Sequence, residues 1–176
     1  QVSGQMQVTD EHVPFLSEAA YRTLILHSPE YVYPGPSTNK RFWFREAACI
    51  NHALLSAGLT GRAERALDRL PARQTGRGYF HSQEGEWDSN GQVLWLLWRF
   101  VELGGELPDA SFKKVIEKGA EWIIKKRRRA RHGPAWAGLL PAGFSAEHLG
   151  PNDHYYWDNY WSIAGLNAAA DLMHHE

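Results

Sequence analysis

A segment near the carboxyl end of the chain brings together residue types that could recognise and cleave a sugar. Residues 143–161 read GFSAEHLGPNDHYYWDNYW, which mixes three carboxylic acids with three tyrosines and two tryptophans. Flat aromatic rings stack against the C–H faces of a sugar ring, and carboxylates accept hydrogen bonds from its hydroxyl groups. We therefore expect this segment to form part of a carbohydrate site.

Two acids of this segment, Glu147 and Asp153, are candidate proton donors. Cleavage of a glycosidic bond generally uses one carboxyl group that protonates the leaving oxygen and a second that activates water or attacks the sugar. Neighbouring rings could exclude water from either acid and favour its protonated form, as a general acid requires. Tyr155, Trp157 and Asp158 are candidates for contact with the sugar, although an aromatic stripe also suits a helical core.

A second candidate set lies in the run RFWFRE at residues 41–46. The guanidinium of Arg45 can bind two adjacent hydroxyl groups while Glu46 accepts from another, and Trp43 offers a platform for the ring. This arrangement would orient a sugar rather than transfer a proton. The alternative is an Arg/Glu pair that only ties two helical hairpins together.

A third set lies in residues 84–88, EGEWD, directly before a predicted helix. The positive end of the helix dipole stabilises charged carboxylates, so Asp88 is better suited to binding hydroxyl groups than to donating a proton. Gln92 follows one helical turn later and could join that role. The alternative is that Asp88 caps the helix and Trp87 covers the core.

Neither a metal nor a nucleic acid is expected as a partner, and no cofactor is predicted. His148 and His154 flank Asp153 without the helical spacing or third ligand that metal sites use. The basic run at residues 125–131 suits a solvated helix end, where cations complement the dipole. Lys and Arg total 19 against 20 for Asp and Glu, so the net charge of −1 gives no general attraction to polyanions.

Sequence features also bound the setting of the chain. No apolar run approaches the ~18 residues of a membrane span, and no secretory signal is visible, which favours the cytoplasm. Cys49 is the one cysteine of the sequence and is predicted to be a buried structural thiol. The absent initiator Met and an ending without a helix stop suggest a piece of a longer protein.

The elements that must position these groups are helices, because no useful strand alternation occurs. We expect a single all-helical domain over residues 1–176, built from antiparallel hairpins. A helix over residues 89–104 is apolar nearly all round, so we place it centrally, with Ser89 or Asn90 as its cap. Six helices are predicted, over residues 14–27, 42–57, 62–70, 89–104, 109–129 and 156–173.

Three motifs in order resemble the six-hairpin glycosidases, particularly glucoamylase-like enzymes. They are the aromatic-Arg-acid run at 41–46, DSNGQVL at 88–94, and the Gly-Leu-Leu-Pro loop at 138–141 that leads to an aromatic helix. The resemblance covers most of residues 20–172. It implies an all-α fold whose helical hairpins form part of an (α/α)6 toroid.

The resemblance implies that Trp43, Arg45 and Glu46 line the subsite for the terminal sugar, although the family more often has Asp after the Arg. It also places the general acid near Glu147 or Asp153, although the usual Trp-Glu pattern is absent. The chain could build about half of such a toroid. We therefore expect a fragment of a larger enzyme, or a short relative that assembles with another copy, with hydrolysis incomplete in the chain alone.

The expected function is that of a glycoside hydrolase-like fragment acting on an α-glucan or related oligosaccharide with inversion. One alternative is a noncatalytic carbohydrate-binding or helical scaffold module. Another is the helical toroid of an isoprenoid cyclase, which the Trp-rich apolar helices would fit. Such a cyclase needs an acidic initiating motif, for which residues 84–88 are a poor substitute.

Overall fold

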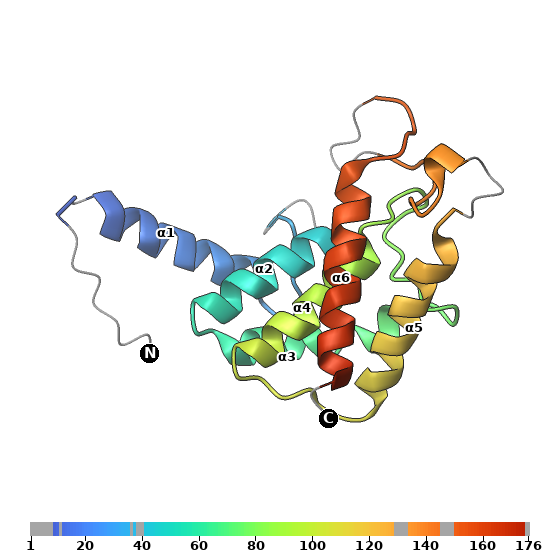
Figure 1. Ribbon diagram of the computed structural model, residues 1–176. Helices are drawn as coiled ribbons and strands as arrows, with labels where there is room; N and C mark the ends of the chain where they lie inside the picture. The colour runs from blue at the N-terminus through green and yellow to red at the C-terminus, as the bar shows by residue number, and fades with distance from the viewer. Residues whose placement is uncertain are drawn as a thin grey trace. The chain divides into compact units, whose positions relative to one another are not determined.

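The computed structural model describes residues 9–10, 12–35, 37, 41–128, 134–144 and 150–174, and within these ranges the chain is helical without a β-strand (Figure 1). The all-α prediction is confirmed. Two isolated antiparallel bridges, Gln74 with Phe80 and Gly143 with Asp153, join loop segments. The helices are α1 (His12–His27), α2 (Phe44–Ser56), α3 (Thr60–Leu67), α4 (Ser89–Glu102), α5 (Ser111–Lys126) and α6 (Tyr156–His174).

The chain divides into two compact units, residues 1–66 and 67–176. In the first unit, α2 buries one face, formed by residues that recur every three or four positions: Phe44, Ala47, Ala48, Asn51, Leu54 and Leu55. Gly58 ends this helix as predicted, with a φ of 73° that suits a residue without a β-carbon. Cys49 is exposed, so the expectation of a buried thiol is wrong. The helical period turns position 49 away from the buried face.

Helix α1 is held in the first unit through its carboxyl end. None of its residues is buried, and Phe15, Leu16 and Leu26 are exposed. The guanidinium of Arg62 in α3 donates hydrogen bonds to the backbone oxygens of Ser28 and Ile25. Ile25 lies in the last turn of α1 and Ser28 directly follows the helix, so this cation meets the carboxyl end of α1 and complements its dipole.

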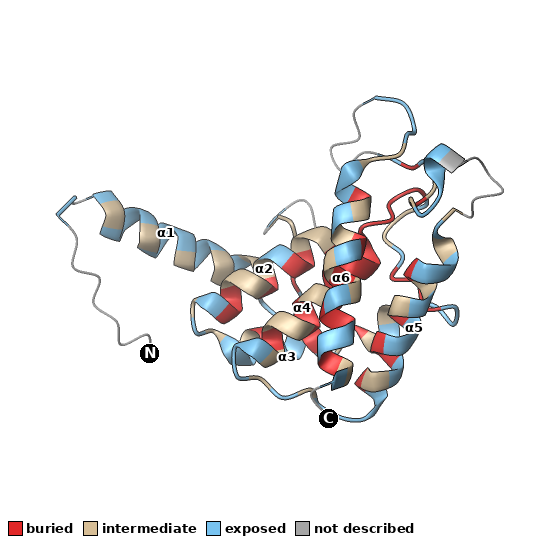
Figure 2. Cartoon of the chain, viewed as in Figure 1, coloured by how far each residue is buried: buried red, intermediate tan, exposed pale blue. Residues whose placement is uncertain are grey.

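In the second unit, α4 packs against both α5 and α6, which also contact each other. Its buried residues include Leu94, Leu96 and Leu97, and Figure 2 shows α4 as a largely buried element. This confirms its predicted central position. A Cβ atom at Gly91 would lie 2.1 Å from the backbone oxygen of Trp161, so the backbones of α4 and α6 are in direct contact there.

The beginning of α4 is organised by tertiary bonds rather than by a local cap. Ser89 and Asn90, predicted as caps, lie inside the helix, and the residue before it, Asp88, makes no side-chain cap bond. The amide of Asn90 donates to the backbone oxygens of Gly78 (2.9 Å) and Gly119 (3.0 Å), and its oxygen accepts from Phe80 N (2.9 Å). One buried side chain thus joins α4 to a loop and to α5.

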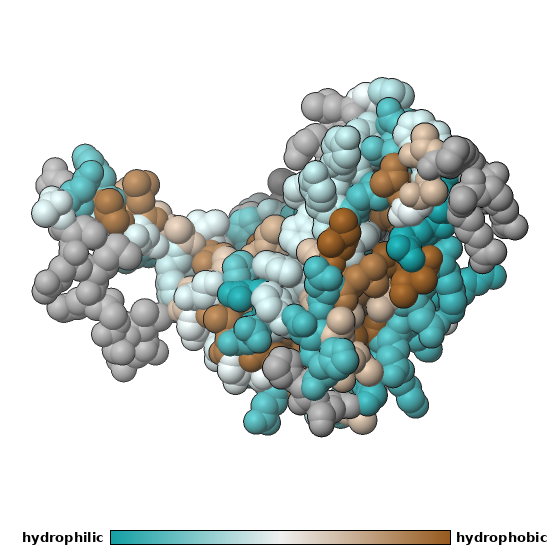
Figure 3. Space-filling model, in the orientation of Figure 1, coloured by the Kyte–Doolittle hydropathy of each residue, from teal (hydrophilic) through white to brown (hydrophobic). Residues whose placement is uncertain are grey.

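One face of the α5 and α6 pair is mostly apolar, although Glu117 and Glu121 also line it. A hollow of about 550 Å³ lies between the two helices, and Figure 3 shows hydrophobic surface gathered there. Its lining includes Ile116, Ile124, Leu166 and Met173. This face is separate from the residues singled out in the sequence.

Candidate functional site

A hydrogen-bonded set at one end of α4 and α6 joins three of the predicted site residues. The indole Nε1 of Trp157 donates to Oδ2 of Asp88 at 2.7 Å, and Nε2 of Gln92 donates to the same oxygen at 2.9 Å. Asp88 and Gln92 are 2% and 1% exposed, whereas Trp157 is 40% exposed. A buried carboxylate therefore holds the polar edge of a ring whose remaining surface reaches solvent.

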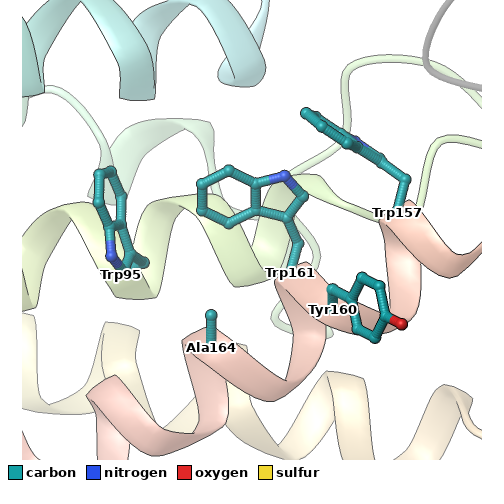
Figure 4. A pocket seen from close by; sticks show the side chains of 5 residues that line it. All are labelled: Trp95, Trp157, Tyr160, Trp161 and Ala164. Carbon is teal, nitrogen blue, oxygen red and sulfur yellow. The ribbon is translucent and has the colours of Figure 1, made fainter.

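Trp157 also lines a hollow of about 390 Å³ in the second unit (Figure 4). The other lining residues are Trp95 from α4 and Tyr160, Trp161 and Ala164 from α6. The rings of Trp95 and Trp157 each meet Trp161 edge to face, with centroids 5.4 and 5.9 Å apart. The wall is thus aromatic and carries no charged side chain among these five residues.

The loops before α4 and before α6 lie together. The backbone N of Phe144 donates to the oxygen of Gly85 at 2.9 Å, and Gly143 and Asp153 exchange two backbone bonds of 2.9 and 3.1 Å. A Cβ at Gly143 would lie 2.2 Å from the oxygen of Gly85, so only glycine fits this approach. The segments around Asp88 and Asp153 therefore occupy the same end of the second unit.

Of the two candidate proton donors, Asp153 is the one that lies among the described residues. Asp153 is exposed, and its Oδ1 accepts a bond from the backbone N of His154 at 2.7 Å. The expected enclosure of this carboxyl by aromatic rings is not present among the described residues. Glu147 lies outside the described residues. Asp158, predicted to bind sugar, is buried in the first turn of α6.

Tyr155, another predicted contact, lies at the edge of the loop. It is half-buried, and its hydroxyl donates to the backbone oxygen of Pro151 at 2.6 Å. Beside it, the ring of His154 stacks on Trp136 with centroids 4.6 Å apart, and its Nδ1 lies 2.7 Å from the oxygen of Leu140. The histidine therefore helps to fix the loop that precedes α6.

The run at residues 41–46 belongs to the first unit. Trp43 has extended backbone geometry directly before α2, and the guanidinium of Arg41 lies 4.5 Å from the centroid of its ring. Arg45 and Glu46 are half-buried in the first turn of α2. The expectation that these residues share a site with Asp88 stays a prediction.

Trp87 belongs to the core, as the alternative interpretation of residues 84–88 predicted. It is buried together with Tyr79 and Leu140, and Trp122 stacks on Tyr79 with centroids 4.2 Å apart. The ammonium of Lys126 lies 3.7 Å from the centroid of the Trp87 ring. Part of the basic run thus has a structural role, since a cation over an indole face is attracted to it.

Burial raises the pKa of Tyr79 above its ordinary value, and the negative charges of Glu84, Asp88 and Glu86 raise it further. Its hydroxyl donates to the backbone oxygen of Glu86 at 2.6 Å. The phenol therefore stays protonated and acts as a hydrogen-bond donor. It ties the acidic loop to the aromatic core beneath it.

Sequence reasoning left four lining residues of the hollow out of the site, and three of them are Trp95, Trp161 and Ala164. The spacing of residues 157, 161 and 164 along one side of a helix was the available signal, and it equally suits a core stripe. Trp95 comes from another helix, so only the fold reveals its place. Tyr160 likewise belongs to the lining.

Among the described residues, no group of three His, Cys, Asp or Glu side chains is placed to hold a metal ion. No helix in the same ranges is long and apolar enough to cross a membrane. No protein-family model, curated protein or solved structure matches the chain.

Proposed function

We propose that the chain is a glycoside hydrolase-like catalytic-domain fragment that binds a neutral oligosaccharide, such as an α-glucan, in the aromatic hollow. The observation that carries the proposal is the ring of Trp157, which is held at its N–H by Asp88 and lines a hollow with two further tryptophans. Indole faces stack on the C–H faces of sugar rings. A wall without charge suits a neutral ligand.

The size and surroundings of the hollow support this reading. Its volume of about 390 Å³ falls within the range of roughly 300–1,000 Å³ typical of small-molecule sites. The loop that leads into α6 carries the exposed carboxyl of Asp153, a group that could bind hydroxyls. We also propose that the helical hairpins form part of an (α/α)6 toroid, which further sequence or another copy completes.

For the chemical step, Glu147 and Asp153 remain the proposed proton donors, with Trp43, Arg45 and Glu46 as further sugar contacts. Inverting cleavage needs a second carboxylate that activates water. The test compares reducing-sugar release by the wild-type protein with that of its Glu147→Gln and Asp153→Asn variants. Loss of release with retained binding supports catalysis by the altered acid, and undiminished release in both variants removes this assignment.

Binding is tested separately by calorimetric titration of the full chain with maltotetraose. We expect Trp157→Ala to weaken binding at least tenfold, because it removes a wall of the hollow. The matched control is Trp98→Ala, since Trp98 on α4 is half-buried and lies outside the lining residues. Equal affinities of wild type and Trp157→Ala would place the ligand elsewhere.

A noncatalytic carbohydrate-binding module is the second candidate. Two observations favour it: the carboxyl of Asp153 is exposed, and Oδ2 of Asp88 is occupied by Trp157 and Gln92. Such a module binds maltotetraose without releasing reducing sugar, including when further sequence or a second copy completes the domain. A panel of glycans assayed for both binding and cleavage distinguishes the two functions.

A further inference from the structure

Gln92 is too deeply buried to meet a ligand in the hollow. It is 1% exposed, and its Nε2 donates to Oδ2 of Asp88, one helical turn earlier on α4. The same oxygen accepts from Trp157, which belongs to α6 and lines the hollow. The hydrogen-bonded path from Gln92 to the hollow therefore runs through Asp88 and the indole.

We propose that Gln92 and Asp88 are positioning residues that fix the ring of Trp157 as a rigid wall of the ligand site; this inference rests on the proposed carbohydrate function. The indole is 40% exposed, and a side chain with that freedom loses rotamer entropy when a ligand orders it. A hydrogen bond from its Nε1 to a buried carboxylate removes that cost beforehand.

Gln92 contributes by fixing the acceptor. Its amide donates to the oxygen that Trp157 uses, so the two donors together restrict the rotation of the Asp88 carboxylate. Both donors bind the same oxygen, so both contribute to the direction of Oδ2. Loss of the glutamine amide should therefore loosen the indole without replacing any side chain that lines the hollow.

The first experiment records the indole N–H signals of the ¹⁵N-labelled full chain, with Trp157 assigned from a Trp157→Phe variant. We expect Asp88→Leu to shift the Trp157 signal upfield and to speed its hydrogen exchange at least tenfold. Gln92→Met, which keeps the side-chain size but has no N–H donor, produces a smaller change of the same kind. Asp88→Asn keeps an oxygen acceptor and should largely restore the signal.

Ser162→Ala is the control, because Ser162 is also buried on α6 but makes none of these bonds. It should leave the Trp157 signal in place. An unchanged Trp157 signal in folded Gln92→Met would overturn the inference. Circular dichroism establishes folding, and if Asp88→Leu does not fold, the Gln92→Met and Asp88→Asn signals decide the result.

The second experiment titrates maltotetraose into variants in two backgrounds. Gln92→Met should weaken binding about three- to tenfold when residue 157 is Trp, a change of the size that one hydrogen bond produces. In the Trp157→Phe background it should have no further effect. Equal weakening in both backgrounds would show a general structural role and overturn the inference. If wild type does not bind maltotetraose, the proposed ligand fails, while the N–H signals still decide whether Gln92 positions the indole.

Discussion

Gly91 of α4 and Gly165 of α6 bring two helix backbones into contact, since a Cβ at Gly165 would lie 2.5 Å from the Cα of Gly91. Helices that meet through ordinary side chains have axes about 8–10 Å apart. The backbones of α4 and α6 lie closer than such side chains would allow at this point. The crossing holds Trp157, on α6, beside Asp88, at the start of α4. Two glycines therefore underlie the hydrogen bond that defines the candidate site.

Gly165→Ala should destabilise the second unit, because its new methyl group meets the backbone of Gly91 rather than a side chain that can rotate. We expect a loss of about 2 kcal/mol or more in the free energy of unfolding. Urea unfolding followed by tryptophan fluorescence measures the change. Gly61→Ala in α3 is the control, since its Cβ would meet only the end of the Arg65 side chain, at 4.0 Å, and the change should be neutral or slightly stabilising. Equal stabilities of the two variants would contradict the close crossing.

Asn90→Ala should cost about 3 kcal/mol of stability. It leaves a buried N–H at Phe80 and buried carbonyls at Gly78 and Gly119 without their side-chain partner. Thermal unfolding followed by circular dichroism measures the loss. Asn167→Ala, at an exposed position of α6, should change stability by no more than about 0.5 kcal/mol. A similarly small effect at Asn90 would show that the three bonds contribute little.

Arg62→Met should loosen the carboxyl end of α1, because the backbone oxygens of Ser28 and Ile25 lose a cationic donor. Amide hydrogen exchange at Ser28 and Tyr33, whose N–H groups bond within this turn, should become about tenfold faster. Arg65→Met is the control, since the guanidinium of Arg65 donates to the backbone oxygen of Gly61 in its own helix. Unchanged exchange in Arg62→Met would rule out this capping role.

Alkaline pH should destabilise the protein through Tyr79. Burial and the acids Glu84, Asp88 and Glu86 raise its folded-state pKa, so the folded protein holds the phenolic proton more tightly than the unfolded chain does. This contribution is complete below the unfolded pKa of about 10 and falls as pH rises above it. Urea unfolding at pH 8 and pH 11 measures the loss.

Tyr79→Phe should remove that alkaline loss while lowering stability near pH 8 by about 1 kcal/mol, because the hydroxyl bond to Glu86 disappears. Tyr156→Phe serves as the comparison, since Tyr156 is 75% exposed and should keep the wild-type pH dependence. The assignment fails if Tyr79→Phe loses as much stability as wild type between the two pH values.

Helices were the most predictable part of the fold. The last helix was expected at residues 156–173 and spans Tyr156–His174, because this stretch is dense in apolar and aromatic residues and a Gly/Pro-rich loop precedes it. The central position of α4 followed from its apolar residues on all sides. These features are local, so a single sequence contains them.

Tertiary bonds could not be predicted in the same way. Ser89 and Asn90 are residue types that cap helices, yet their partners lie in a loop and in α5. Asp88 and Trp157 were both singled out, but they are 69 positions apart, and spacing along the chain does not indicate that they bond. The nearby exposed Asp153 shows the same limit, because aromatic neighbours in sequence need not enclose a carboxyl group.

The backbone pairing of Gly143 with Asp153 bears on how this chain can diversify. The two ends of the intervening stretch are joined by main-chain hydrogen bonds, and only the first end requires a particular residue, the glycine at 143. Replacement or lengthening of the sequence between them therefore leaves the anchoring points of the stretch intact. The pair offers a grafting site at which new specificities can be selected beside an unchanged helical framework.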